Sequence, residues 1–284
     1  MSVSTMGTSF GTRLRASLSP RLLLSELLLK QWFEPVIPFT LMIALLLWFS
    51  ATIPNYAGLE NFLSLMRLYA EFGFVATGMA FCLITGGIDL SVGAMFALCN
   101  FTALFLLNVA QLPVPLVILG TMAVGATVGG INGLLIGYLK ARPFLTTLVT
   151  LIILRASVNI LNEKFATVFA TNSVESDTWD FLGEGYVLGI PINVATLFVV
   201  LIIGHIFLSR SRYGWHLTAI GASRKAARHA GIPVERMLLV TYALSGMLCA
   251  IGGVFYAARQ TVPLPPASET PPRMTAVSAW NSQR

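Results

Sequence analysis

A short run at residues 86–93, Gly-Gly-Ile-Asp-Leu-Ser-Val-Gly, combines helix-breaking glycines with a carboxylate. Asp89 is the only acidic residue in the apolar stretch 72–139, and a charge that faces lipid costs several kcal/mol. We therefore expect Asp89 to face a cavity, an interface or the edge of a membrane. Two interpretations stay open: a discontinuous element beside a transport path, or a turn between helices that Asp89 or Ser91 caps. The residues assigned to this helix break are Gly86, Gly87, Asp89, Ser91, Gly93 and Asn132.

A second pattern is a ladder of glycines at four-residue spacing. Residues with this spacing share one face of a helix, and small residues there let another membrane helix approach closely. We expect the partner to be a helix of the same chain, with a second copy as the alternative. Asn132 lies beside this face, and we expect it to form a hydrogen bond between helices rather than to line a polar pore. The ladder, assigned to helix packing, consists of Gly125, Gly129, Gly133 and Gly137.

A third pattern lies in the basic segment 209–236. Ser223 can cap a helix over residues 224–230, and Gly231 can end it in the left-handed conformation. Two turns are too short to be stable alone in water, so this helix must dock on something. Anionic lipid headgroups are one candidate; a cytosolic partner is favoured because the helix has defined ends. The residues assigned to this docking element are Gly221, Ser223, Ala226, Ala227, Gly231 and Ile232.

Missing motifs exclude several kinds of chemistry. The sequence has no G-x-x-x-x-G-K-[ST] loop for nucleotide phosphates, so any ATP and Mg belong to another subunit. An intramembrane aspartyl protease needs two facing carboxylates, and Asp89 is alone. We therefore expect a chain that is not an enzyme, with no catalytic residue, metal site or cofactor. The residues without metal-ligand or disulfide spacing are His205, His216, His229, Cys82, Cys99 and Cys249.

An all-α membrane bundle must position these residues. Of 284 residues, 56% are hydrophobic and only 11% are charged, and the mean hydropathy is +0.78. A soluble domain carries about 25% charged residues. Since a membrane-spanning helix needs about 20 apolar residues, the sequence predicts a polytopic transmembrane helical bundle of about seven spans. The predicted spans are 36–53, 62–85, 90–110, 116–139, 143–162, 186–208 and 237–258.

The charges between the spans predict their orientation. The net charge of +6 comes from short basic patches between apolar runs, which argues against nucleic acid as a partner. Basic residues mark cytoplasmic loops; they precede the first span, occur at Lys140 and Arg142, and recur through 209–236. The loop 163–184 instead carries five acids and one lysine. If the N-terminus is cytoplasmic, the predicted spans place every basic loop in the cytoplasm and the acidic loop outside.

The chain divides into three predicted parts. Residues 1–34 form a cytoplasmic leader, in which Ser19-Pro20 begins a helix that lies on the inner leaflet; a frayed leader is the alternative. Residues 35–260 form the transmembrane domain, with the cytoplasmic loop 209–236. Residues 261–284 contain five prolines, which forbid a spanning helix, and we expect a disordered polar tail.

Three blocks resemble the permease subunits of ABC importers for monosaccharides, of the ribose/xylose/arabinose/galactose type. The first is ITGGIDLSVG at 84–93, and the second joins NGLLI at 132–136 to PFLTTL at 143–148. The third is YG, AIG, AA, GI and YALSG, in that order, within 213–246. Their order and spacing resemble the family across roughly residues 36–260.

The resemblance implies a channel-forming subunit of the bacterial inner membrane, surrounded by membrane lipid and paired with a second permease subunit as a homodimer or heterodimer. A cytosolic ATP-binding subunit and a periplasmic sugar-binding protein would complete the importer. The helix over 224–231 would match the coupling helix that enters a cleft of the ATPase. The identity of the sugar does not follow from the resemblance.

The C-terminal region departs from the family pattern. Members of the family continue beyond the position of Arg259 with a glycine-rich block and further spans, whereas this chain continues into the proline-rich tail. We expect a truncated or frameshifted end. Two alternatives to an active importer subunit therefore stay open: a gradient-driven secondary carrier with Asp89 as its ion or proton site, and an inactive truncated permease.

Overall fold

A computed structural model of the chain describes residues 33–171 and 176–260. These residues are almost entirely helical, which confirms the predicted all-α class. They divide into two compact units, one ending at Phe62 and the other beginning at Leu63. The predicted leader helix and the polar tail over 261–284 lie outside the described residues.

Each predicted span corresponds to an apolar helix. Helices suit a membrane because each satisfies its own backbone hydrogen bonds. Five of the helices are long and apolar enough to cross a membrane, and α3 and α5 add shorter apolar stretches, Val36–Thr52 and Val92–Asn108. The helices are α3 Phe33–Thr52, α4 Leu59–Ile84, α5 Val92–Asn108, α6 Val114–Gly137, α7 Pro143–Thr171, α9 Ile192–Arg210 and α12 Val234–Arg259.

The first unit contains α3. From Val36 onward its side chains are exposed, and most are large and apolar. The hydroxyl of Thr52 donates a hydrogen bond to the carbonyl of Trp48, at 2.8 Å, so this polar group is satisfied within the helix. A helix with an apolar surface on all sides is suited to lipid.

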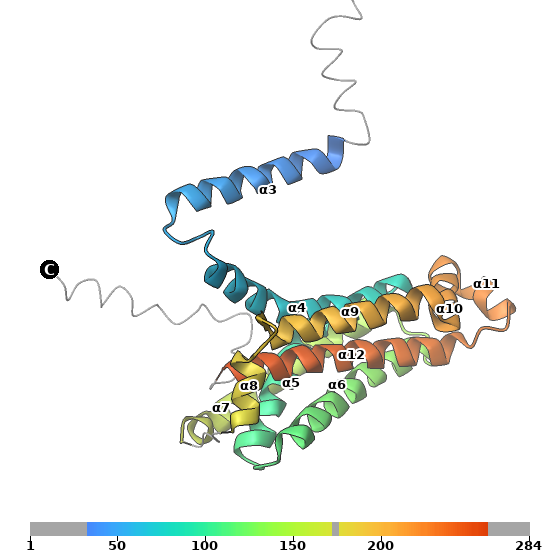
Figure 1. Cartoon of the computed structure of the whole chain (residues 1–284). Helices are drawn as coiled ribbons and strands as arrows, with labels where there is room; N and C mark the ends of the chain where they lie inside the picture. The colour runs from blue at the N-terminus through green and yellow to red at the C-terminus, as the bar shows by residue number, and fades with distance from the viewer. Residues whose placement is uncertain (1–32, 172–175, 261–284) are drawn as a thin grey trace, which may run out of the picture. The chain divides into compact units, whose positions relative to one another are not determined.

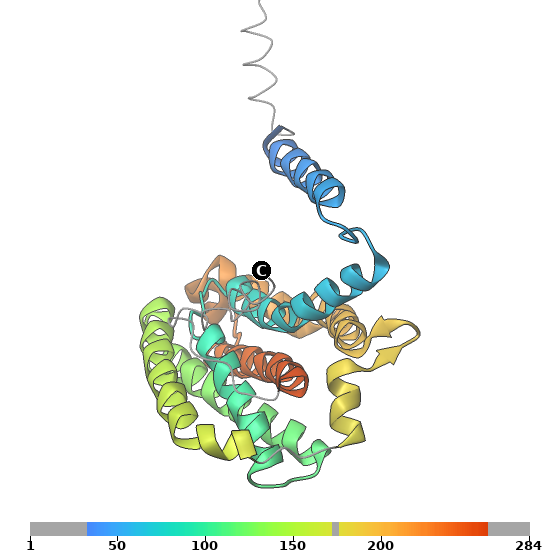
Figure 2. The ribbon, with the colours of Figure 1, turned by 90° about the vertical axis from the view of Figure 1, so that its left-hand side faces the viewer.

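The second unit is arranged around α12, whose residues are mostly buried. Figure 2 shows α12, in red, with α4, α5 and α6 around it. Glycines bring these helices close: Gly78 of α4 packs on Ser245 of α12, and Gly253 of α12 packs on Cys99 of α5. The core of this unit is therefore built around one central helix.

The connections gather at two ends of this unit, as Figure 1 shows. One end carries α10 Arg212–Ala222 and α11 Arg224–His229. The turn with Lys140 and Arg142 lies at the same end, since Gly137 packs on Glu235 in the first turn of α12. The other end carries α8 Asp177–Glu184 and the antiparallel strands β1 Tyr186–Val187 and β2 Ile190–Pro191. The two basic segments among the described residues thus share one end, and the acidic helix α8 lies at the other.

Two predicted span boundaries are wrong. The span predicted over 186–208 begins as a hairpin, because Leu188 and Gly189 adopt positive φ angles of 53° and 80° and turn the chain between β1 and β2. The helix starts only at Ile192. The span predicted to end at 162 continues to Thr171, because Phe165 and Phe169 pack on Phe101 of α5.

Candidate functional site

The predicted docking helix is α11, and its ends agree with the prediction to within one residue. The Ser223 hydroxyl accepts a hydrogen bond from the backbone N–H of Ala226, at 3.3 Å. Beyond the helix, Gly231 adopts a φ of 80°, a conformation that costs glycine little. These local signals determine where the helix begins and ends. Because a helix of six residues has little stability of its own, it also needs the packing described next.

One side of α11 is buried and the other is exposed. Ala227 is only 4% exposed and belongs to a core cluster with Ile220 and Val234. Ala226 and Gly231 are exposed, and Ile232 is half-buried. Of the residues assigned to docking, Gly221, Ser223, Ala226 and Gly231 are exposed and can meet a partner, whereas Ala227 fixes α11 to the bundle.

An ion pair joins α11 to α12. The guanidinium of Arg228 donates to Glu235 Oε1 from Nε, at 3.1 Å, and from Nη2, at 2.6 Å. Both side chains remain open to solvent, at 47% and 29% exposure. Exposed pairs of this kind add little stability, so this contact orients α11 more than it holds it.

The α10–α11 region contacts the predicted helix break directly. Gly221 of α10 lies so close to the carbonyl of Ile84 that a Cβ atom would overlap the oxygen. Gly86 lies in the turn just after α4, adopts a φ of 74° and lies beside Gly221. Only glycine fits both requirements, close approach at one position and a left-handed backbone at the other.

The break itself spans residues 85–91, which are not α-helical. Asp89 Oδ1 accepts hydrogen bonds from the backbone N–H of Ser91, at 2.9 Å, and from its hydroxyl, at 2.5 Å. Ser91 occupies the N-cap position of α5, but its side chain caps no backbone group. Of the two predicted capping residues, it is Asp89 that accepts a backbone N–H at the start of α5. Gly93 faces open space at the start of α5.

A buried hydrogen-bond chain extends from Asp89 to α6 and α7. Asn132 Nδ2 donates to Ser91 Oγ, at 3.0 Å, and Thr150 Oγ1 donates to Asn132 Oδ1, at 2.6 Å. Asn132 thus forms the expected hydrogen bonds between helices. Asp89, Ser91 and Asn132 are all fully buried.

Thr147 adds a second link between the helix break and α7. Its hydroxyl donates to the carbonyl of Ile88, at 3.3 Å, and accepts from the backbone N–H of Leu90, at 3.1 Å. Sequence reasoning missed Thr147 and Thr150 as site residues. The only signal was the PFLTTL block, which contains Thr147 but ends before Thr150.

Two buried polar atoms beside this chain have no hydrogen-bond partner in the described part of the molecule. They are Asp89 Oδ2 and the hydroxyl of Tyr242 on α12. Burial raises the pKa of Asp89, which lies in the connection between α4 and α5, and the hydrogen bonds from Ser91 oppose that rise. The hydroxyl of Tyr242 lies against Gly87, where a Cβ atom would overlap it. The site therefore keeps one acceptor and one donor unused.

The glycine ladder of α6 faces α12. A Cβ atom at Gly125 would overlap the carbonyl of Gly246, and one at Gly129 would overlap the carbonyl of Tyr242. Gly133 packs on Leu239, and Gly137 on Glu235. The partner of this face is thus a helix of the same chain.

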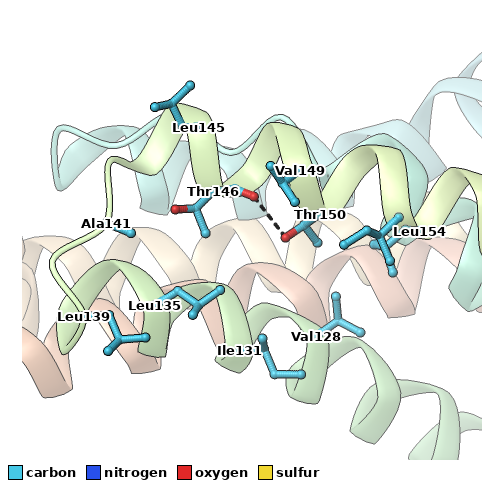
Figure 3. A pocket seen from close by; sticks show the side chains of 11 residues that line it. Val128, Ile131, Leu135, Leu139, Ala141, Leu145, Thr146, Val149, Thr150 and Leu154 are labelled. Atoms are coloured by element: carbon cyan, nitrogen blue, oxygen red, sulfur yellow. Dashed lines mark hydrogen bonds between the residues drawn. The ribbon is translucent and has the colours of Figure 1, made fainter.

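A groove of about 510 Å³ lies between α6 and α7 (Figure 3). Aliphatic side chains line most of it, including Ile131, Leu135 and Val149. The hydroxyls of Thr146 and Thr150 are its side-chain polar groups, and both donate to backbone or side-chain oxygens. Such a lining does not match a polar solute. Among the described residues, no cluster of His, Cys, Asp and Glu could hold a metal ion.

A buried ion pair at the opposite end was missed in the sequence. Arg259, in the last turn of α12, donates from Nε and Nη2 to the two carboxylate oxygens of Glu71, at 3.0 and 2.9 Å. Glu71 is fully buried and the Arg259 side chain is 23% exposed. No sequence signal joins two residues 188 positions apart.

Known permeases are similar to this chain over most of its length. The chain is 35% identical to the ribose import permease protein RbsC of Bacillus subtilis over 234 residues, which cover 82% of this chain and 71% of that protein. It is 30% identical to RbsC of Haemophilus influenzae over 231 residues, covering 81% and 70%. Against the L-arabinose transport system permease protein AraH of Escherichia coli it is 31% identical over 217 residues, covering 74% of this chain and 62% of AraH.

The match to a family profile is equally broad. The profile described as branched-chain amino acid transport system / permease component matches residues 61–279. No solved structure matches the chain. With its apolar helices and its similarity to transport permeases, the chain is a multi-pass membrane protein, and it belongs to the branched-chain amino acid transport system / permease component family.

Proposed function

We propose that this chain is the membrane-spanning subunit of an ATP-driven importer that carries a monosaccharide into the cell. The observation that carries the proposal is the similarity, over most of the chain, to permeases named for ribose and L-arabinose transport. The apolar bundle supports it, because such a subunit forms the path across the membrane. The gradient-driven carrier gains no support from these relatives.

The α10–α11 end is the proposed surface for a separate ATPase chain, which would hold ATP and Mg while this chain holds no cofactor. Exposed Lys225 and Ala226 support this assignment, since a small residue beside a cation permits close contact with an acidic or polar cleft. Buried Ala227 also supports it, because it fixes α11 to α12 and lets α11 transmit a push. Gly221, Ser223, Gly231 and Ile232 would shape this surface rather than bind nucleotide.

The proposed orientation follows the basic residues. The α10–α11 end and the N-terminus would face the cytosol of a bacterial inner membrane, since positive residues favour that side. The opposite end, with Asp177, Asp180 and Glu184, would face a periplasmic sugar-binding protein. A second permease subunit would complete the path, and lipid would surround the exposed apolar helices.

Co-purification tests this proposal. The affinity-tagged chain, expressed in its native host and solubilised gently, should carry a cytosolic ATPase in near-equal amount, identified by mass spectrometry. Vesicles with the assembled complex should then take up radiolabelled D-ribose, L-arabinose or D-fructose when ATP is supplied, even after ionophores collapse ion gradients. A folded chain without ATPase, or uptake that stops with the gradient, would overturn the proposal.

An exposed substitution sharpens this experiment. Ala226→Asp places an acid on the open side of α11 and should reduce ATPase recovery without unfolding the bundle. Thr178→Asp is the matched control, because Thr178 is also exposed on a short helix but lies at the opposite end. Equal ATPase recovery from both variants would remove α11 as the docking surface.

A further inference from the structure

The helix break at 85–91 is in contact with three other parts of the second unit. Gly221 of α10 lies beside Gly86 and against Ile84, the residue just before the break. Asn132 of α6 bonds to Ser91, and Thr147 of α7 bonds to Ile88. A displacement of α10 and α11 cannot be absorbed by empty space here, because Gly221 already lies against the Ile84 carbonyl. The segment is therefore a physical connection between the docking end and two apolar helices.

The contact with α10–α11 is tight on its apolar side as well. Ile84 packs against a core cluster that contains Leu217, Ile220 and Ala227. Packed interiors deform little and shift as units. A push on α11 would therefore reach Ile84 through buried side chains, and reach Gly86 through the backbone.

The hydrogen bonds beyond Ile84 run in one direction. Thr150 donates to Asn132, Asn132 donates to Ser91, and Ser91 donates to the Asp89 carboxylate. Thr150, Asn132 and Ser91 each donate one of these bonds, and Asp89 only accepts. Of the four side chains, all but that of Thr150 are fully buried. In a low-dielectric interior such linked bonds strengthen one another. Movement of the Asp89 turn therefore disturbs α6 and α7 together.

Two unpaired polar atoms beside this segment could pair with each other in a second arrangement. Asp89 Oδ2 is an acceptor and the Tyr242 hydroxyl is a donor, and neither has a partner in the described residues. Buried polar groups without partners raise the free energy of a state. A shift of residues 87–89 toward Tyr242 would lower that cost by pairing the two, and a coupled transition needs an element with two states of this kind.

We propose that residues 84–91 are a relay that carries displacement of the α10–α11 end to α6 and α7, with Asp89, Ser91, Asn132, Thr147 and Thr150 as its positioning residues. The proposal rests on the proposed function, because it names how the ATPase-facing end would act on the path. None of these residues needs to contact sugar. Asp89 serves as the terminal acceptor of the chain, and its bond partners change as the relay moves.

Thr150→Val tests the relay with little change in shape, because it removes the donor and keeps the branched side chain. Thr150→Ser is the matched control, since it keeps the donor. Both are assembled with the ATPase in lipid vesicles, and three quantities are measured: ATPase recovered, basal ATP hydrolysis, and radiolabelled sugar imported per ATP hydrolysed. We expect Thr150→Val to lower import per ATP about fivefold or more, with ATPase recovery unchanged and the serine variant close to wild type.

Import per ATP equal to wild type in Thr150→Val would overturn the relay. If Thr150→Val does not assemble, Thr147→Val carries the same test, because it removes the other link to α7. Gly221→Ala provides an independent measurement: its effect on import per ATP should be smaller in the Thr150→Val background, and strictly additive effects would also overturn the relay. A wild-type chain that binds no ATPase would instead refute the proposed function, whatever the variants do.

Discussion

An arginine–glutamate pair lies at each end of α12, and the two pairs differ in kind. At the basic end, Arg228 and Glu235 are seven residues apart and both are partly exposed. At the acidic end, Arg259 and Glu71 are 188 residues apart, and Glu71 is completely buried. Breaking an exposed pair costs little, whereas breaking a buried pair leaves a charge without a partner. The acidic pair therefore contributes more to holding α12 than the basic pair does, and we expect movement at the basic end to cost less.

The surroundings of the two pairs agree with this difference. At the acidic end, Gly183 of α8 packs on the backbone of Ala258, and the Arg67 guanidinium lies 4.8 Å from the ring centroid of Tyr186. At the basic end, the neighbouring turn has left-handed Gly86 and two buried polar atoms without partners among the described residues. The acidic end also contains one such atom, Arg67 Nε. The difference between the two ends therefore rests mainly on the complete burial of Glu71 in its pair with Arg259.

Arg259→Met should have the largest effect on stability. It leaves the buried Glu71 carboxylate without its bidentate partner, and loss of one member of a buried pair costs about 3–5 kcal/mol. The measurement is unfolding of the purified protein in mixed detergent micelles. The double variant Glu71→Gln with Arg259→Met should recover part of the loss. A change below about 1 kcal/mol would mean that the pair does not hold the end of α12.

Gly129→Ala should have the second-largest effect on stability. Its methyl group would overlap the Tyr242 carbonyl, so α6 and α12 must separate, at a cost of about 1–3 kcal/mol. Gly130→Ala is the matched control, because the added Cβ would lie 3.9 Å from the Ala243 Cβ, an ordinary contact. The same micelle unfolding assay compares them, and equal stability would refute the close approach of α6 to α12.

Tyr242→Phe should change stability and transport in opposite directions. It removes a buried hydroxyl without a partner in the described structure, so stability should rise by up to about 1 kcal/mol. Import per ATP should fall, because the second arrangement of the relay loses its donor. Unfolding and vesicle uptake are measured on the same preparation, and unchanged uptake would mean that Tyr242 takes no part in the relay.

Arg228→Met should have the smallest effect on stability, within about 1 kcal/mol, because its pair with Glu235 is open to solvent. Its effect should appear instead in ATPase recovery, since α11 loses a contact that orients it. Comparison with Arg259→Met in one unfolding series tests the contrast directly. If Arg228→Met lowered the free energy of unfolding as much as Arg259→Met does, the two ion pairs would not differ in the way described.

Composition and local signals were enough to predict the long apolar helices and the short helix α11, but not α8 or α10. Long apolar runs identified the spans, and Ser223 with Gly231 marked α11 to within one residue. These features depend on neighbours in sequence. The hairpin that ends at Pro191 was missed because its residues are as apolar as the helix that follows.

Contacts between distant residues could not be predicted. The spacing of the glycines identified one packing face of α6, but only the structure assigns α12 as its partner in the chain. Asn132 was expected to form a hydrogen bond between helices. Nothing in the sequence, however, indicated that the hydroxyl of Thr150 donates to the side-chain oxygen of Asn132. The pairing of Glu71 with Arg259 likewise depends on how α4 and α12 are packed.

Hydrogen exchange read by mass spectrometry tests the central contrast most directly. The complex with its ATPase is compared in lipid with and without a non-hydrolysable ATP analogue. We expect changed exchange in peptides covering 84–91 and 221–231, and unchanged exchange in those covering 67–72 and 255–259. Equal changes at both ends of α12, or changes confined to the acidic end, would contradict it.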